Sequence, residues 1–313
     1  MIAQNLFGLQ FVGEDPLKGE VWQNNVWKFA LYEQDDTAQT SPLGVLYVDP
    51  FMRPGKTVGS AQFTLRCSKE LEDGSRQVPC TALVMSLPPG QVEMSFSMAQ
   101  TFMHEIGHVF HSLLSRTELQ HLSGTRGEVD FVEFPSLLFE HFVTDPQYLE
   151  QYAKAEDGSA IPSDFAQATS RQAELFCHME VAQQLLHAIV DQAANSCTGH
   201  SATAVRDTID ATFNKFLYLP ASKAAGLDRK TLDLCSPPVL SSFDHLLHYG
   251  GTYYCYISCR ALANHIWQRS LGRTMWDREF GKRLQKFFHR GSSDQSLSSI
   301  MDLVAEEHHH VPL

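Results

Sequence analysis

Five consecutive residues, His104-Glu105-Ile106-Gly107-His108, form an H-E-x-x-H motif. Residues four positions apart project from the same side of a helix, so two neutral imidazoles can bind one metal ion there. Glu105 stands beside them, where a carboxylate can take a proton from a water molecule that the metal has made more acidic. The motif is short, and a helix with two unrelated surface histidines would also show it.

A third metal ligand is predicted downstream at Glu133. The chain can turn back before it, because a Gly-Thr break at 124–125 interrupts the helical pattern. A catalytic zinc ion needs three protein ligands and one open position, which two histidines and one glutamate provide. The metzincin pattern is excluded, since it needs glycine and histidine at the positions that His111 and Leu114 occupy.

Three further polar residues near the motif each have two interpretations. Asp130 and Glu140 share a helical face with Glu133 if this segment is a helix, so either carboxylate can accept the free N–H of a ligand histidine. A solvated carboxylate is the alternative for each. For His111 we expect packing, or support of a ligand, because a fourth protein ligand would close the open position of the site.

Tyr249, Tyr253 and Tyr256 follow one another at helical spacing. By spacing alone this stripe is typical of a buried core. The glycine pair at 250–251 favours a loop that moves over a site instead. Phenol groups in such a loop can donate hydrogen bonds to a developing oxyanion.

Several segments resemble the thimet-oligopeptidase family of zinc peptidases. The segments HEIGHVFH and SGTRGEVDFVEFPS are similar to its zinc-binding signature, and DPFMRPGK and EDGSRQ also resemble it upstream. HLLHYGGTYYCY is similar to its substrate-binding loop. Within this family the chain most resembles the branch of the mitochondrial intermediate peptidases. The segments that carry this resemblance are GEVW, RTELQHLSGTRGEVDFVE and His245, four residues before Tyr249.

The resemblance assigns roles to individual residues. It implies one Zn²⁺ per chain, held by His104, His108 and Glu133, with Glu105 as the catalytic base. It also implies that four residues line the substrate site, namely His245, Tyr249, Tyr253 and Tyr256. The large helical N-terminal region of the family has no counterpart in these 313 residues. We therefore expect a truncated chain that is a poor enzyme on its own. Its expected partner is the N-terminal helical region of the same protein.

The resemblance also implies a biological task. A zinc-dependent endopeptidase of this branch would remove N-terminal presequence peptides from precursor proteins imported into the mitochondrial matrix. The first alternative is a general oligopeptidase that degrades short peptides, with a cytoplasmic location possible. The second alternative is an inactive fragment that binds peptides without cleaving them.

These residues must be positioned by a mainly α fold with a small antiparallel β-sheet. The implied class is the zincin-like, neurolysin-like catalytic domain, here spanning residues 1–313. Residues 21–90 contain short runs separated by turn-like stretches, which predict a β-rich part with strands at 26–33, 44–51, 61–67 and 80–87. Residues 97–313 are mainly helical in pattern. A capping box at Ser97 and Gln100 begins the motif helix, and further helices are expected at 131–153, 167–195, 203–217, 250–271 and 276–290.

Composition narrows the class of protein. Hydrophobic residues make up 43% of the chain, which supports a sizeable core. The net charge of −12 disfavours nucleic acid as a partner, and no apolar run reaches the ~20 residues of a membrane span. The seven cysteines contain no C-x-x-C pair, so we expect free thiols in a reducing compartment. The first residues fit neither a secretory signal nor an Arg-rich transit peptide.

Overall fold

The computed structural model describes residues 1–36, 41–56, 59–91, 93–155, 157–199, 201–218, 226, 250–294 and 297–305. The chain divides into two compact units, one of Met1–Arg171 and Cys259–Leu313 and the other of Gln172–Ser258. The H-E-x-x-H motif and Glu133 belong to the first unit, and Tyr253 and Tyr256 to the second. His245 and Tyr249 lie outside the described residues.

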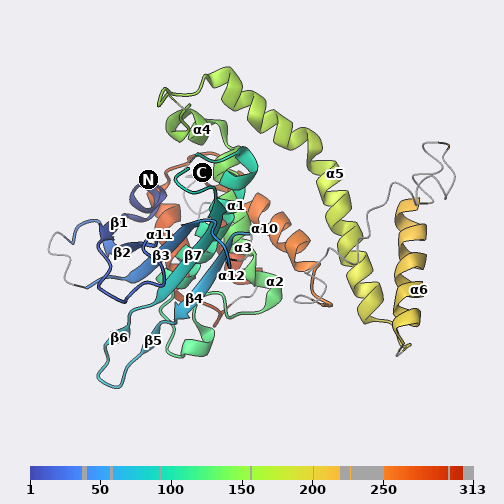
Figure 1. Cartoon of the computed structure of the whole chain (residues 1–313), viewed down its shortest axis with the longest axis horizontal. Helices are drawn as coiled ribbons and strands as arrows, with labels where there is room; N and C mark the ends of the chain where they lie inside the picture. The colour runs from blue at the N-terminus through green and yellow to red at the C-terminus, as the bar shows by residue number, and fades with distance from the viewer. Residues whose placement is uncertain are drawn as a thin grey trace, which may run out of the picture. The chain divides into compact units, whose positions relative to one another are not determined.

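The first unit contains a five-stranded sheet in the order β1-β2-β3-β7-β4 (Figure 1). Its strands are β1 (Leu9–Glu14), β2 (Trp27–Glu33), β3 (Gly44–Phe51), β7 (Cys80–Leu87) and β4 (Ala61–Arg66). The four runs predicted as strands are confirmed, whereas β1 was not predicted. Two short strands, β5 (Lys69–Glu70) and β6 (Arg76–Gln77), pair in a separate hairpin.

The sheet is mainly antiparallel, as expected, and contains one parallel pairing. Strand β7 runs parallel to β3 and antiparallel to β4. The cause is topological: the chain leaves β3, forms β4 and the β5–β6 hairpin, and then returns to insert β7 between β3 and β4. Strand β4 is therefore an edge strand, although it is not the last strand in sequence.

Helix α1 (Phe96–Leu114) packs on this sheet (Figure 1) and contains the H-E-x-x-H motif. It begins at Ser95, whose side-chain oxygen accepts a hydrogen bond from the N–H of Met98 at 3.3 Å. The capping box expected at Ser97 and Gln100 is thus wrong by two residues, because Ser95 already satisfies an N-terminal N–H group. Its buried side chains include Val109, Phe110 and Leu113, which join the main core.

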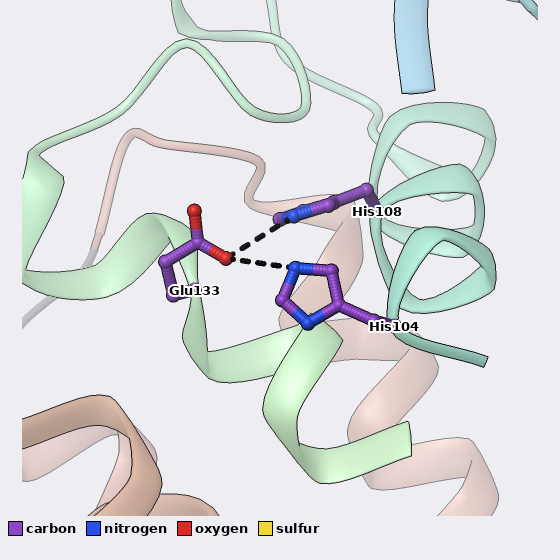
Figure 2. Close-up of side chains that lie close together, drawn as sticks. All are labelled: His104, His108 and Glu133. Carbon is purple, nitrogen blue, oxygen red and sulfur yellow. Dashed lines mark ion pairs between the residues drawn. The ribbon is translucent and has the colours of Figure 1, made fainter. Parts of the chain in front are cut away.

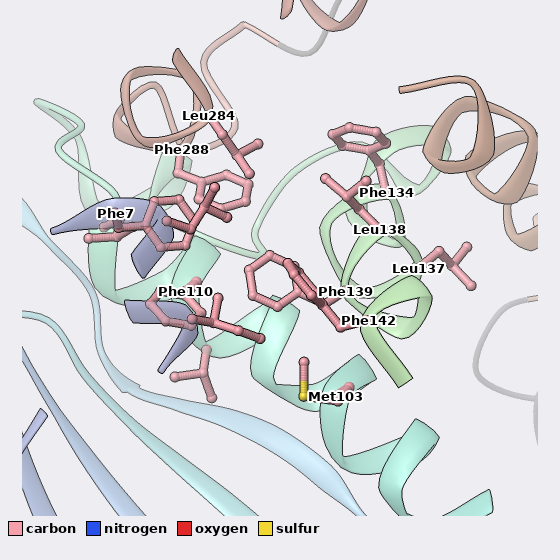
Figure 3. Close-up of a cluster of buried hydrophobic side chains, with 14 of the residues drawn as sticks. Phe7, Met103, Phe110, Phe134, Leu137, Leu138, Phe139, Phe142, Leu284 and Phe288 are labelled. Atoms are coloured by element: carbon pink, nitrogen blue, oxygen red, sulfur yellow. The ribbon is translucent and has the colours of Figure 1, made fainter. Parts of the chain in front are cut away.

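The main core lies between the sheet, α1 and α3 (Phe134–Thr144), as Figure 3 shows for its central residues. Phe110 of α1 lies 5.0 Å from Phe7 and 5.4 Å from Phe139 of α3, measured between ring centroids. Gly107 allows the two helices to approach closely. A Cβ atom at this position would lie 2.5 Å from the carbonyl oxygen of Pro135, a distance that real side chains do not tolerate.

The remaining elements of the first unit surround this core. They are η1 (Ala3–Phe7), η2 (Gln120–Leu122), α2 (Val129–Val132), α4 (Pro146–Tyr152), α11 (Arg278–His289) and α12 (Leu297–Ala305). The helices expected at 131–153 and 276–290 are confirmed, with the first divided into α2, α3 and α4. Pro135 and Pro146 stand in the first turns of α3 and α4, where a missing N–H costs little.

The second unit is helical. It contains most of α5 (Ser163–Asn195), all of α6 (Ala202–Phe213) and η3 (Asn214–Tyr218), and the first turn of α10 (Cys255–Arg269). A small core of Val190, Ile209 and Phe213 joins α5 to α6. The helices predicted at 167–195, 203–217 and 250–271 are confirmed, although residues 250–254 form turns rather than helix. None of the described helices is both long and apolar enough to span a bilayer.

Candidate metal centre

Helix α1 places the two motif histidines on one side, facing α3. Their rings lie 5.0 Å apart between centroids and are nearly perpendicular, at 81°. Figure 2 shows both imidazoles projecting from the same helix toward Glu133. The four-residue spacing therefore produces the arrangement that the sequence predicted.

Glu133 occupies the junction between α2 and α3 and closes the third side of the cluster. One carboxylate oxygen, Oε2, lies 3.3 Å from Nε2 of His104 and 3.3 Å from Nε2 of His108 (Figure 2). Ser136 donates a hydrogen bond to the same Oε2 at 2.9 Å and so fixes the carboxylate. These three side chains form the one group of potential metal ligands among the described residues.

The donor set fits a zinc ion. Zinc bonds to nitrogen and oxygen are about 2.0–2.1 Å long, and a tetrahedral arrangement then separates two ligand atoms by roughly 3.3 Å. The observed distance between each imidazole nitrogen and Oε2 is 3.3 Å. Two imidazoles and one carboxylate, without thiolates, also leave an open position, as a catalytic zinc site requires.

Glu140 contacts the ring nitrogen of His104 that does not face Glu133. Its Oε1 lies 2.6 Å from Nδ1 of His104, and its Oε2 accepts a hydrogen bond from the amide of Gln100 at 2.8 Å. This contact fixes the ring and leaves Nε2 facing Glu133. Of the two carboxylates considered for this role, Asp130 and Glu140, the structure places Glu140 in contact with the ligand histidine.

The two motif histidines lie among ionisable carboxylates. Burial lowers the pKa of His104, but its hydrogen bonds with Glu133 and Glu140 outweigh burial and raise the pKa to about 10. Burial acts to raise the pKa of Glu133, and the hydrogen bonds from His104 and His108 hold it well below its usual range. A buried carboxylate that stays ionised beside two imidazoles suits a divalent cation. Such a cation would replace protons on the imidazole nitrogens.

Glu105 contacts strand β4. The residue is buried, with 8% of its surface exposed, and its Oε2 accepts a hydrogen bond from the main-chain N–H of Gln62 at 2.7 Å. Burial raises the pKa of this carboxyl group, which is the direction that strengthens a base. Gln62 was not predicted from the sequence, because its contact with α1 arises only when the sheet and the helix pack.

His111 takes no part in the ligand cluster. It is fully buried, its Nε2 lies 3.3 Å from the carbonyl oxygen of Gly291, and its ring packs against Phe131 and Phe288. Burial lowers the pKa of His111 to about 4, so the ring is neutral at physiological pH. The packing role expected for this residue is confirmed.

In the second unit, Tyr253 is held at three points. Its hydroxyl donates to Gln184 at 2.7 Å, its main-chain N–H donates to Asp191 at 3.0 Å, and its ring lies 5.7 Å from that of His187. The ring of Tyr256 lies 5.2 Å from that of Tyr253 and is only partly buried. Tyr253 thus behaves as part of a core, whereas Tyr256 keeps exposed surface.

Comparisons with known proteins agree with this chemistry. Residues 1–312 match the family described as Peptidase family M3. The chain is 29% identical to mitochondrial intermediate peptidase of Homo sapiens over 91% of its length and 38% of the relative. The same named protein of Arabidopsis thaliana is 30% identical over 98% of this chain and 42% of the relative, and that of Aspergillus fumigatus is 33% identical over 90% and 39%. The chain therefore spans about two fifths of the length of these curated relatives.

Proposed function

Because this chain belongs to peptidase family M3, a family of metallopeptidases with a mainly helical, zincin-like fold, we propose that it is the zinc-binding part of a peptidase. The observation that carries this proposal is the convergence of two imidazole nitrogens on one carboxylate oxygen at 3.3 Å, with a buried glutamate beside them. The ligands would be His104, His108 and Glu133.

The metal supplies one part of the chemistry. When bound, zinc acts as a Lewis acid that polarises a carbonyl oxygen and lowers the pKa of water from about 15.7 to about 7. The remaining steps belong to side chains. Glu140 would hold His104 in the orientation that directs Nε2 at the metal, as its 2.6 Å contact with Nδ1 supports.

Glu105 would carry the proton. Its carboxylate removes a proton from the attacking water while the water oxygen bonds to the scissile carbonyl carbon. It then delivers that proton to the amide nitrogen as the C–N bond breaks. One water molecule is consumed, and a carboxyl group and an amine are released. The raised pKa of Glu105 supports this role, because a stronger base accepts the proton more readily.

The substrate would be an extended peptide. Strand β4 is an edge strand, and Gln62 within it contacts Glu105, so a peptide that added to this edge would lie next to the base. His245, Tyr249, Tyr253 and Tyr256 would line the rest of the substrate site. Among these we propose Tyr256 as a donor to the oxyanion, since its side chain is only partly buried.

The biological task would be removal of presequence peptides from proteins imported into the mitochondrial matrix. The support is the name of the curated relatives, which are mitochondrial intermediate peptidases. A general oligopeptidase that degrades short peptides is the alternative within the same family. Cleavage of a presequence-bearing precursor in preference to free peptides of eight to ten residues (roughly the size of one extended strand) would favour the first task over the second.

The decisive experiment compares the wild-type chain with Glu105→Gln. We expect about one zinc ion per chain in both proteins by elemental analysis, because glutamine leaves the three ligands in place. Hydrolysis of a quenched fluorescent peptide should be lost in the variant, because an amide is a poor base. A wild-type chain that binds no zinc, or a variant that hydrolyses peptide as fast as an active wild type, would overturn the proposal.

A further inference from the structure

Gln62 lies where the sheet meets the base. Among the described strands, β4 has β7 on one side and no neighbour on the other, and the main-chain N–H of Gln62 donates to Glu105 of α1. We propose that Gln62 is a positioning residue for the catalytic base, a role that rests on the proposed function of Glu105. Its N–H holds one oxygen of the carboxylate, so that the other oxygen is free to face the attacking water.

The side chain of Gln62 fixes the strand that carries this N–H. Its amide nitrogen donates to the hydroxyl of Ser112 on α1 at 3.2 Å and also contacts the hydroxyl of Thr81 on β7. Thr81 is fully buried and donates in turn to the carbonyl oxygen of Phe63 at 2.9 Å. One amide group thereby connects the edge strand, its neighbour and the motif helix.

The contact points recur along one face of α1. Ser112 follows Glu105 by about two helical turns, so both project toward β4. Gln62 therefore bonds to the helix twice, with its N–H at Glu105 and with its side chain at Ser112. A carboxylate held by a fixed donor loses rotational freedom, and a base displaced by about 1 Å can cost roughly 10²-fold in rate.

The first test needs neither metal nor activity. An outward-facing amide on an edge strand exchanges quickly with solvent deuterium unless it is hydrogen-bonded. In the metal-free chain, the Gln62 amide should be protected, and Glu105→Ala should speed its exchange by about tenfold or more. The Leu83 amide of β7, inside the sheet, serves as the control and should not change. Equal exchange of Gln62 in the two proteins would overturn the proposal.

The second test separates the N–H from the side chain. Gln62→Ala keeps the N–H and removes the amide anchor, whereas Gln62→Pro removes both. Proline is tolerated on an edge strand whose N–H points away from the ladder, so the sheet pairing is retained. With zinc bound and a quenched fluorescent peptide as substrate, we expect kcat to fall about tenfold in Gln62→Ala and by roughly a further tenfold in Gln62→Pro. KM and zinc content should stay near wild type.

Two outcomes would contradict the proposal. Equal kcat values for the proline and alanine variants would show that the Gln62 N–H does not position Glu105. An increase in KM alone would show that this N–H contacts the substrate instead. If the proline variant does not fold, the exchange measurement still decides whether the contact exists. A wild-type chain that binds no zinc would refute the proposed function, and protection of the Gln62 amide would remain a separate result.

Discussion

Glu133 is the proposed metal ligand that contacts both histidines. Both imidazoles approach its Oε2, and the residue is 3% exposed. We expect Glu133→Ala to weaken zinc affinity by about 10²-fold or more, because a catalytic site keeps only three protein ligands. Glu128→Ala, an exposed glutamate at the start of α2, is the matched control and should bind zinc normally. Competition with a chelator measures both affinities, and equal values would remove Glu133 from the site.

Tyr253 and Tyr256, the two predicted site tyrosines within the described residues, should differ in function. Tyr256→Phe removes a hydroxyl that we assign to the oxyanion, so kcat should fall by roughly 10²–10³ with a smaller change in KM. Tyr253→Phe removes a hydroxyl bonded to Gln184, so the main expected effect is lower stability, by about 1 kcal/mol. Steady-state kinetics and thermal unfolding of both variants test this division. An unchanged rate for Tyr256→Phe would show that Tyr256 has a packing role and does not donate to the oxyanion.

At the scale of elements, the turn before α10 depends on a buried aspartate in α5. The carboxylate of Asp191 accepts hydrogen bonds from the N–H groups of Gly251 and Tyr253, at 2.8 and 3.0 Å, and it is fully buried. Gln192 adds a hydrogen bond to the carbonyl oxygen of Gly251 at 2.7 Å. The glycine pair at 250–251 suggested a moving loop. Hydrogen bonds from α5 instead hold the side of this pair that leads into Tyr253 and Tyr256.

Asp191→Asn should loosen this turn. Asparagine keeps one acceptor oxygen and replaces the other with a donor, which faces an N–H instead of bonding to it. We expect faster hydrogen exchange at Gly251 and Tyr253, with the amides of α1 unchanged. Asp207→Asn, which changes an exposed aspartate of α6 in the same unit, makes the same charge change and serves as the control. Unaltered exchange at both amides would show that Asp191 does not hold the turn.

The sequence allowed the elements to be predicted better than their pairing. GVLYVDPF and CTALVMSL are short, mostly apolar runs bounded by turn-like stretches, so strands at 44–51 and 80–87 followed from local pattern. That β7 would lie beside β3 and parallel to it could not be predicted, because strand order is decided by contacts between distant segments. Strand β1 was missed for a local reason, since Gly13 weakens a short pattern.

The candidate site shows the same division. His104, Glu105 and His108 are adjacent in sequence, and Glu133 follows at a spacing that the motif context made recognisable. Glu140 was one of two candidates, and only the packing of α3 against α1 distinguishes it from Asp130. Gln62 and Asp191 have no motif that marks them in the sequence. Gln62 donates its main-chain N–H to Glu105 of another element, and Asp191 accepts hydrogen bonds from N–H groups of another segment. His245 and Tyr249 stay predictions outside the described residues.

At the scale of the whole molecule, buried neutral histidines make stability depend on pH. Burial lowers the pKa of His111 to about 4, below its ordinary value of about 6.5. Between these values the unfolded chain binds a proton that the folded chain does not, so stability should fall as the pH falls from 6.5 to about 4. A shift of this size corresponds to on the order of 3 kcal/mol at the acid end. His141 and His289 have pKa values lowered in the same direction by burial.

His111→Leu tests this expectation. Leucine fills the same apolar site beside Phe131 and Phe288 but cannot bind a proton. Urea unfolding of the metal-free chain at pH 7.5 and at pH 4.5 (chosen to bracket the ordinary histidine pKa of about 6.5) gives the free energy of unfolding of each protein. The loss of stability between the two values should be smaller in the variant than in wild type. The same loss in both proteins would show that His111 does not contribute to acid sensitivity.

The absence of a side chain at Gly107 has a consequence for which ions the centre accepts. The backbones of α1 and α3 meet there, and the histidines are attached to the first helix while Glu133 precedes the second. In the proposed centre, the distance between these helices would limit the radius of the bound ion, because calcium, with oxygen contacts of about 2.3–2.6 Å, needs its ligands farther apart than zinc does. Gly107→Ala should push the helices apart and lower affinity for zinc more than for larger cations. Isothermal titration with a series of divalent ions would reveal this change in selectivity, and an unchanged order and affinity would show that the contact at Gly107 does not control the size of the ion.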